Sequence, residues 1–144
     1  MSIFAYPSSP AFDPSARCSI ADEAPSSEDS SSLDETIKRA NQDGIKFLLT
    51  ISTEDKSFDN ILKILDNYKC VYGTYGIHPH EAEKHKNIKF NNIVEKIKRN
   101  KKIIGVGETG LDFYYNHSVK KDQIDSFLEH IEASKKTNLP IIVH

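Results

Sequence analysis

The chain has 144 residues, the length of one ordinary domain. Its 19 Lys and Arg residues against 21 Asp and Glu residues leave a formal net charge of −2, so no strong electrostatic footprint for nucleic acid or membranes is expected. No apolar run is long enough for a membrane span, and the first residues lack the basic and apolar regions of a secretory signal. The two cysteines, Cys18 and Cys70, exclude a disulfide-rich framework. We expect Cys70 to be a buried, reduced thiol and the protein to be cytoplasmic.

Residues 1–32 differ in composition from the rest of the chain. They contain four of the six prolines and ten serines, with five acidic residues against the single basic residue Arg17. No apolar periodicity is present, so this segment cannot bury enough surface to offset the entropy lost on ordering. We predict that residues 1–32 are disordered, with a regulatory or docking tail as the alternative, and that residues 33–144 form the folded domain.

Helical and strand-like patterns alternate from residue 33 onward. In the longest helical pattern, Ile124, Phe127, Leu128 and Ile131 are spaced to form an inward face. The strand-like runs are short, apolar and rich in β-branched residues. The order of predicted elements is helix 33–43, strand 45–52, helix 57–68, strand 70–77, helix 88–99, strand 102–107, helix 118–137 and strand 140–144.

Strands separated by helices predict right-handed crossovers and a parallel sheet in an α/β domain. The strands are apolar almost throughout, as expected where helices or further strands cover both faces. Two architectures fit this order: a doubly wound open sheet and a (β/α)8 barrel. Both place functional residues at the carboxyl ends of the strands.

Three of the predicted strands end in residues that bind metals. The second strand ends at His78 and His80, the third is followed by Glu108 and Asp112, and the fourth ends at His144. Carboxylate oxygens and imidazole nitrogens suit divalent metal ions.

Less specific interpretations of the same residues exist. Glu108 alone is more often a loop carboxylate than a ligand, and Pro79 indicates that the strand has ended before His80. A zinc cluster of His78, His80 and His85 is weakly supported, because no C-x-x-C accompanies it. G-V-G-E-T-G (105–110) looks like a dinucleotide-binding loop, but no helix begins within it.

Three motifs together resemble the TatD family of metal-dependent deoxyribonucleases. They are G-I-H-P-H (76–80), I-G-V-G-E-T-G-L-D-F-Y-Y (104–115) and L-P-I-I-V-H (139–144), and their order and spacing also fit. The resemblance covers roughly residues 33–144. It implies an amidohydrolase-like (β/α)8 TIM barrel, of which this chain holds about strands two to five.

The resemblance implies a site as well as a fold. Members of the family bind one or two divalent cations (Mg²⁺, Mn²⁺ or Zn²⁺) and hydrolyse phosphodiester bonds, typically at DNA 3′ ends. Glu108 and His144 are then metal ligands, and His78 contacts the substrate phosphate. Asp112 completes the matched loop with Tyr114 and Tyr115, either as a catalytic residue or by ordering the loop. DNA or another phosphodiester is the expected partner, with no membrane and no obligate protein partner.

The chain departs from the family pattern at both ends. The D-x-H-x-H signature of the family's first strand is absent before His78, and the motif at 139–144 stops at His144. We therefore expect a truncated chain that is inactive alone. The alternative is a non-catalytic remnant or a complementation fragment of a split or frameshifted gene. Strands 45–52 and 139–144 are expected to be open apolar edges.

Overall fold

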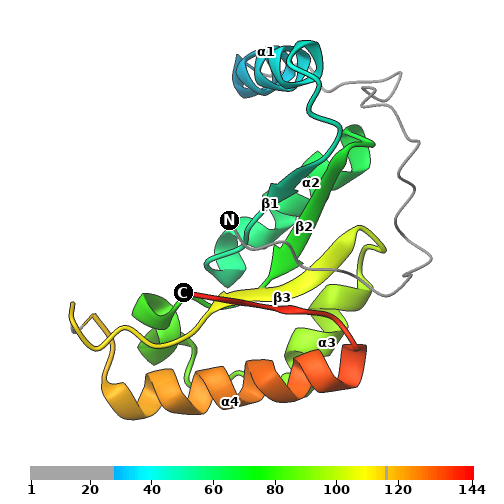
Figure 1. Ribbon diagram of the computed structural model, residues 1–144. Helices are drawn as coiled ribbons and strands as arrows, with labels where there is room; N and C mark the ends of the chain where they lie inside the picture. The colour runs from blue at the N-terminus through cyan, green and yellow to red at the C-terminus, as the bar shows by residue number, and fades with distance from the viewer. Residues whose placement is uncertain (1–27, 116) are drawn as a thin grey trace.

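A parallel α/β architecture is present in the computed structural model, which describes residues 28–115 and 117–144 (Figure 1). The prediction of alternating helices and parallel strands is confirmed. Two 3-10 helices that the sequence did not predict lie beside the strand ends. The helices are α1 (Glu28–Gln42), α2 (Phe58–Asn67), α3 (Phe90–Lys98) and α4 (Lys120–Thr137), the 3-10 helices are η1 (Asp55–Ser57) and η2 (Pro79–His85), and the strands are β1 (Leu48–Thr50), β2 (Val71–Tyr75), β3 (Ile103–Thr109) and β4 (Ile141–Val143).

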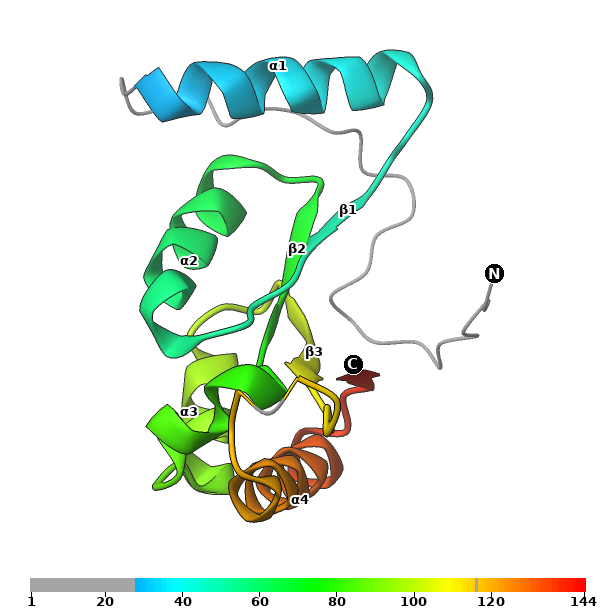
Figure 2. The ribbon, with the colours of Figure 1, turned by 90° about the vertical axis from the view of Figure 1, so that its left-hand side faces the viewer.

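The strands pair in chain order, β1-β2-β3-β4, and every pair is parallel. A doubly wound sheet reverses its strand order at a switch point, so the sequential order excludes that alternative among the described strands. Right-handed crossovers in one direction place every connecting helix on the same face. Figure 2 shows α2, α3 and α4 along one side of a curled sheet, which is the arrangement in part of a (β/α)8 barrel.

The core lies between the sheet and the helices. All five residues of β2 are buried, as expected for a central parallel strand. In α2, the apolar residues Phe58, Ile61, Leu62 and Leu65 are all buried. The largest fully buried side chains include Tyr75, Phe58, Leu65, Ile77 and Ile93.

The inward face predicted for α4 is partly wrong. Ile124 and Leu128 are 43% and 58% exposed, whereas Gln123, Ser126 and His130 are buried. This face of α4 packs against η2 and the end of β3, where backbone groups need hydrogen-bond partners. The side chains of Gln123 and His130 form these hydrogen bonds, and apolar periodicity cannot reveal them.

The first helix begins five residues earlier than its apolar spacing indicates, at Glu28 rather than residue 33. Figure 1 shows α1 beyond the amino ends of β1 and β2, far from the strand ends that hold the candidate site. The sequence predicts disorder for residues 1–32, but residues 28–32 belong to α1, and residues 1–27 lie outside the described residues.

Cys70 is buried but disulfide-bonded, so the expected reduced thiol is wrong. Cys18 lies outside the described residues. Within residues 28–115 and 117–144, no helix is both long and apolar enough to cross a membrane.

Both outer strands leave apolar side chains exposed. Leu49 in β1 is 47% exposed and Val143 in β4 is 56% exposed. Each of these strands pairs on one side only within the described part of the chain. The sheet therefore has two apolar edges, as the sequence predicts.

Candidate metal centre

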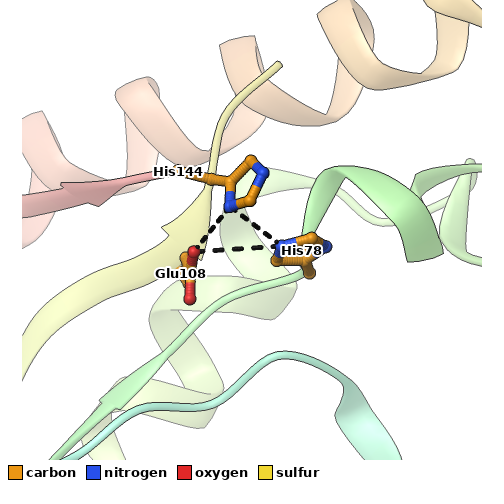
Figure 3. A group of neighbouring side chains, drawn as sticks. All are labelled: His78, Glu108 and His144. Atoms are coloured by element: carbon orange, nitrogen blue, oxygen red, sulfur yellow. Dashed lines mark hydrogen bonds and ion pairs between the residues drawn. The ribbon is translucent and has the colours of Figure 1, made fainter. Parts of the chain in front are cut away.

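Three side chains from three neighbouring strands meet at the carboxyl edge of the sheet (Figure 3). His78 follows β2 and caps η2, Glu108 lies inside β3, and His144 follows β4. One ligand atom from each residue lies within 4.8 Å of the others. Glu108 was predicted to follow the third strand, but β3 continues to Thr109.

The three atoms surround a small volume. Nδ1 of His144 lies 2.9 Å from Oε1 of Glu108 and 3.1 Å from Nε2 of His78. The separation between Nε2 of His78 and Oε1 of Glu108 is 3.8 Å. Two atoms 2.9 Å apart can both reach a cation at bond lengths of about 2.0–2.2 Å.

The residues after β1 hold two members of this cluster by their backbones. The Glu108 N–H donates to the Ser52 carbonyl at 2.8 Å, and the His78 N–H donates to the Thr53 carbonyl at 2.8 Å. Ser52 is fully buried, and its own N–H donates to the Thr74 hydroxyl at 3.3 Å. The backbones of Glu108 and His78 are therefore held in place by the segment that follows β1.

Two glycines allow the backbones to approach each other under the site. A Cβ added to Gly76 would lie 2.4 Å from the Cα atom of Gly107. Gly107 has a φ of +140°, in the region that favours glycine. The peptide bond between Gly107 and Glu108 is cis.

Hydrogen bonding assigns the ring proton of His78. Nδ1 of His78 accepts the His80 N–H at 3.2 Å, so the neutral His78 ring has its proton on Nε2, toward the cluster. Nε2 of His144 lies 3.6 Å from Oδ2 of Asp112, and its Nδ1 lies 2.9 Å from Oε1 of Glu108. An imidazole nitrogen and a carboxylate oxygen this close together are ligand types that suit a divalent cation.

His78 lies in surroundings that favour its neutral form. Burial lowers the pKa of the His78 imidazole, and the neighbouring rings of His144 and His80 lower it further. A neutral ring with its proton on Nε2 is a hydrogen-bond donor toward the centre of the cluster.

A second group of possible metal ligands adjoins the first. Nε2 of His80 donates to Oδ2 of Asp112 at 2.6 Å, and His144 is shared between the two groups. The hydrogen bond from His80 lowers the pKa of the Asp112 carboxyl to about 2. Oδ1 of Asp112 accepts the N–H groups of Tyr114 and Tyr115 at 3.0 and 3.3 Å. Asp112 thus holds the backbone of its loop, and the catalytic role stays a prediction.

His130 supports the site from the buried face of α4. Its Nδ1 donates to the Ser126 carbonyl at 2.7 Å, and its Nε2 accepts the Ile77 N–H at 3.0 Å. Both ring nitrogens therefore form hydrogen bonds. The bond to Ile77 fixes the backbone of the residue that precedes His78.

The structure brings together the four residues predicted to form the site, His78, Glu108, Asp112 and His144. His80 belongs beside them, and the H-x-H spacing was its visible signal. His85 lies outside both groups of possible ligands found in the described residues, and instead lines a hollow with Asp55 and Tyr75. Sequence reasoning missed His130, because a histidine on a helix face carries no specific pattern.

Comparison with known proteins decides the family. The family described as TatD related DNase matches residues 21–144. The chain belongs to this family. An uncharacterized metal-dependent hydrolase of Buchnera aphidicola (subsp. Acyrthosiphon pisum) is 37% identical over 117 residues, covering 78% of this chain and 44% of that protein. The 3′-5′ ssDNA/RNA exonuclease TatD of Shigella flexneri is 26% identical, with 77% of this chain and 42% of that protein covered.

A solved structure confirms the fold. The crystal structure of YjjV, a TatD homologue from Escherichia coli K12, matches with a TM-score of 0.71 and 28% identity, covering 80% of this chain and 45% of YjjV. This TatD-family chain is thus similar in fold to part of a TIM-barrel relative. It spans less than half the length of each of these relatives.

Proposed function

We propose that this TatD-family chain contributes a divalent metal centre that hydrolyses phosphodiester bonds in nucleic acid. The observation that supports this most strongly is the 2.9 Å distance between Nδ1 of His144 and Oε1 of Glu108. Glu108 and His144 are the proposed metal ligands, with Mg²⁺, Mn²⁺ or Zn²⁺ as the cation. The name of the Shigella relative, an exonuclease of single-stranded DNA and RNA, supports a nucleic-acid substrate.

His78 and Asp112 have separate proposed roles. The Nε2 proton of His78 faces the cluster, so it can donate a hydrogen bond to a phosphate oxygen beside the ligands. Asp112 holds His80 and the 112–115 backbone and so positions the rim of the site. A divalent cation at such a site neutralises charge on the phosphate and generates hydroxide near neutral pH.

Metal binding tests the assignment directly. Titration of the protein with Mn²⁺ in a calorimeter should give binding that Glu108→Gln weakens by at least about tenfold, because a ligand then loses its charge. Glu95→Gln is the matched control, since Glu95 is an exposed carboxylate on α3 away from the cluster. Equal Mn²⁺ affinity in the wild-type and Glu108→Gln proteins would contradict the proposal.

Hydrolysis is measured on the same proteins with an end-labelled single-stranded oligonucleotide. Release of nucleotides that requires Mn²⁺ and is lost in Glu108→Gln supports catalysis by this site. Binding of Mn²⁺ without release favours the second candidate, a chain that acts together with further barrel strands. The exposed edges at Leu49 and Val143 are the observation that favours it.

A further inference from the structure

Two tyrosine rings next to the metal cluster face solvent. Tyr114 is 83% exposed and Tyr115 is 62% exposed, on the loop between β3 and α4. The other tyrosines in the described residues, Tyr68, Tyr72 and Tyr75, are all buried. Large exposed rings gathered at one place indicate a binding surface rather than random exposure.

The backbone beneath these rings is firmly bonded. One oxygen of Asp112 accepts the N–H groups of both Tyr114 and Tyr115. The Gln123 amide in turn accepts the Asp112 N–H at 2.8 Å and donates to the Asp112 carbonyl at 2.9 Å. These hydrogen bonds hold the backbone of Tyr114 and Tyr115 in place. A lack of local contacts therefore does not explain why the two side chains are exposed.

Tyr115 lies one ring away from the metal cluster. Its ring centroid is 5.9 Å from that of His80, and the His80 centroid is 5.9 Å from that of His144. Tyr114 meets Tyr115 edge-on, with centroids 4.9 Å apart and an angle of 85° between the rings. The two rings therefore form a corner, and Tyr115 also stacks on His117, with centroids 6.0 Å apart and an angle of 19° between the rings.

We infer that Tyr115 stacks against the nucleobase attached to the phosphate at the His78–Glu108–His144 cluster, with Tyr114 as the side wall. This inference rests on the proposed function and names the side chains that would contact the base of an unpaired end. A base in a duplex has both faces covered by its neighbours, whereas an unpaired end can turn one face to a ring. Stacking on an aromatic side chain tolerates every base, because each base has a π-face.

The test uses a short single-stranded oligonucleotide whose 3′-terminal linkage is a phosphorothioate that resists cleavage, with Mn²⁺ present. Tyr115→Ala should weaken its binding by roughly 5- to 150-fold, the range found for loss of a base–aromatic stack. Tyr115→Phe should bind like the wild type, since the ring remains. Val119→Ala is the control, because Val119 is a 55% exposed apolar residue on the same loop.

An abasic 3′ nucleotide separates stacking from general damage to the loop. On that oligonucleotide, the wild-type and Tyr115→Ala proteins should bind equally, because no base is present to stack. The chain contains no tryptophan, so Tyr115→Trp adds a single fluorescent reporter. Its emission should change on binding of the complete oligonucleotide and stay constant with the abasic one.

The inference is overturned if Tyr115→Ala binds the complete oligonucleotide as tightly as the wild type, or if its loss is equally large on the abasic one. It is also overturned if the wild-type protein does not bind the oligonucleotide. In each case the Mn²⁺ titration of Glu108→Gln stands as a separate measurement of the metal assignment. The failure of base stacking is thereby distinguished from the failure of the metal centre.

Discussion

His130 accepts the backbone N–H of Ile77 through its Nε2 atom at 3.0 Å, from a helix 53 residues further along the chain. The ring is fully buried and donates its remaining proton to the Ser126 carbonyl. A neutral imidazole is required for both bonds, because a protonated ring has no acceptor. Burial accordingly lowers the pKa of His130 to about 4.

The free energy of unfolding should decrease as the pH is lowered and His130 becomes protonated. Since the folded-state pKa of about 4 lies below the ordinary value of 6.5, the stabilisation is complete above pH 6.5 and is lost as the pH falls toward 4. Urea denaturation should show a decrease of about 2 kcal/mol in the free energy of unfolding between pH 7 and pH 5. His130→Gln retains a carbonyl acceptor without a titrating ring, so its pH dependence should be flatter. An equal decrease in both proteins would show that other groups are responsible.

Gly76→Ala should destabilise the fold strongly. The new Cβ would lie 2.4 Å from the Gly107 Cα atom. The three nearest atoms all belong to the backbone of Gly107, which cannot rotate away as a side chain could. We expect a cost of at least about 3 kcal/mol in thermal or urea denaturation. Gly44→Ala is the comparison, because its φ is +79° but nothing lies within 4 Å of the added Cβ. That variant should cost only about 1–2 kcal/mol, from backbone strain alone. A reversed order of the two costs would contradict the close approach of β2 and β3.

Asp112→Asn should loosen the loop that presents the tyrosines. The amide replaces one oxygen that accepts hydrogen bonds, so either the His80 bond or the bonds to Tyr114 and Tyr115 weaken. Hydrogen exchange should become faster at the Tyr114 and Tyr115 amides, while Asp125→Asn on the exposed face of α4 leaves them unchanged. The low pKa of Asp112 adds a pH criterion. The ordering contributes fully above pH 3.8 and is lost only as the pH falls through about 2, so protection should persist in mild acid.

Leu49→Lys should reduce self-association of the chain. Leu49 is an exposed apolar residue on the edge strand β1, and a charge there opposes edge-to-edge pairing. Sedimentation velocity should show less oligomer than in the wild type. Ile124→Lys provides the control, because Ile124 has similar exposure (43%) but lies on α4, away from any strand edge. Equal reduction by both substitutions would point to general solubility rather than the edge.

The sequence by itself determined the order of the elements and the residues at the strand ends. Apolar runs separated by amphipathic segments require parallel strands with crossovers, because both faces of each strand must be covered. The carboxyl ends of such strands lie at one edge. His78, Glu108 and His144 could therefore be grouped before any distance was known, although they are up to 66 residues apart in the chain.

Only the tertiary structure decided what surrounds those residues. The sequential strand order distinguished part of a barrel from a doubly wound sheet, since both produce the same alternation along the chain. The polar inner face of α4 depends on which backbone groups it meets, so its apolar spacing was misleading. The exposed corner of Tyr114 and Tyr115 likewise arises from one carboxylate that binds two amides and a histidine. Such contacts depend on distances between segments that a linear pattern does not contain.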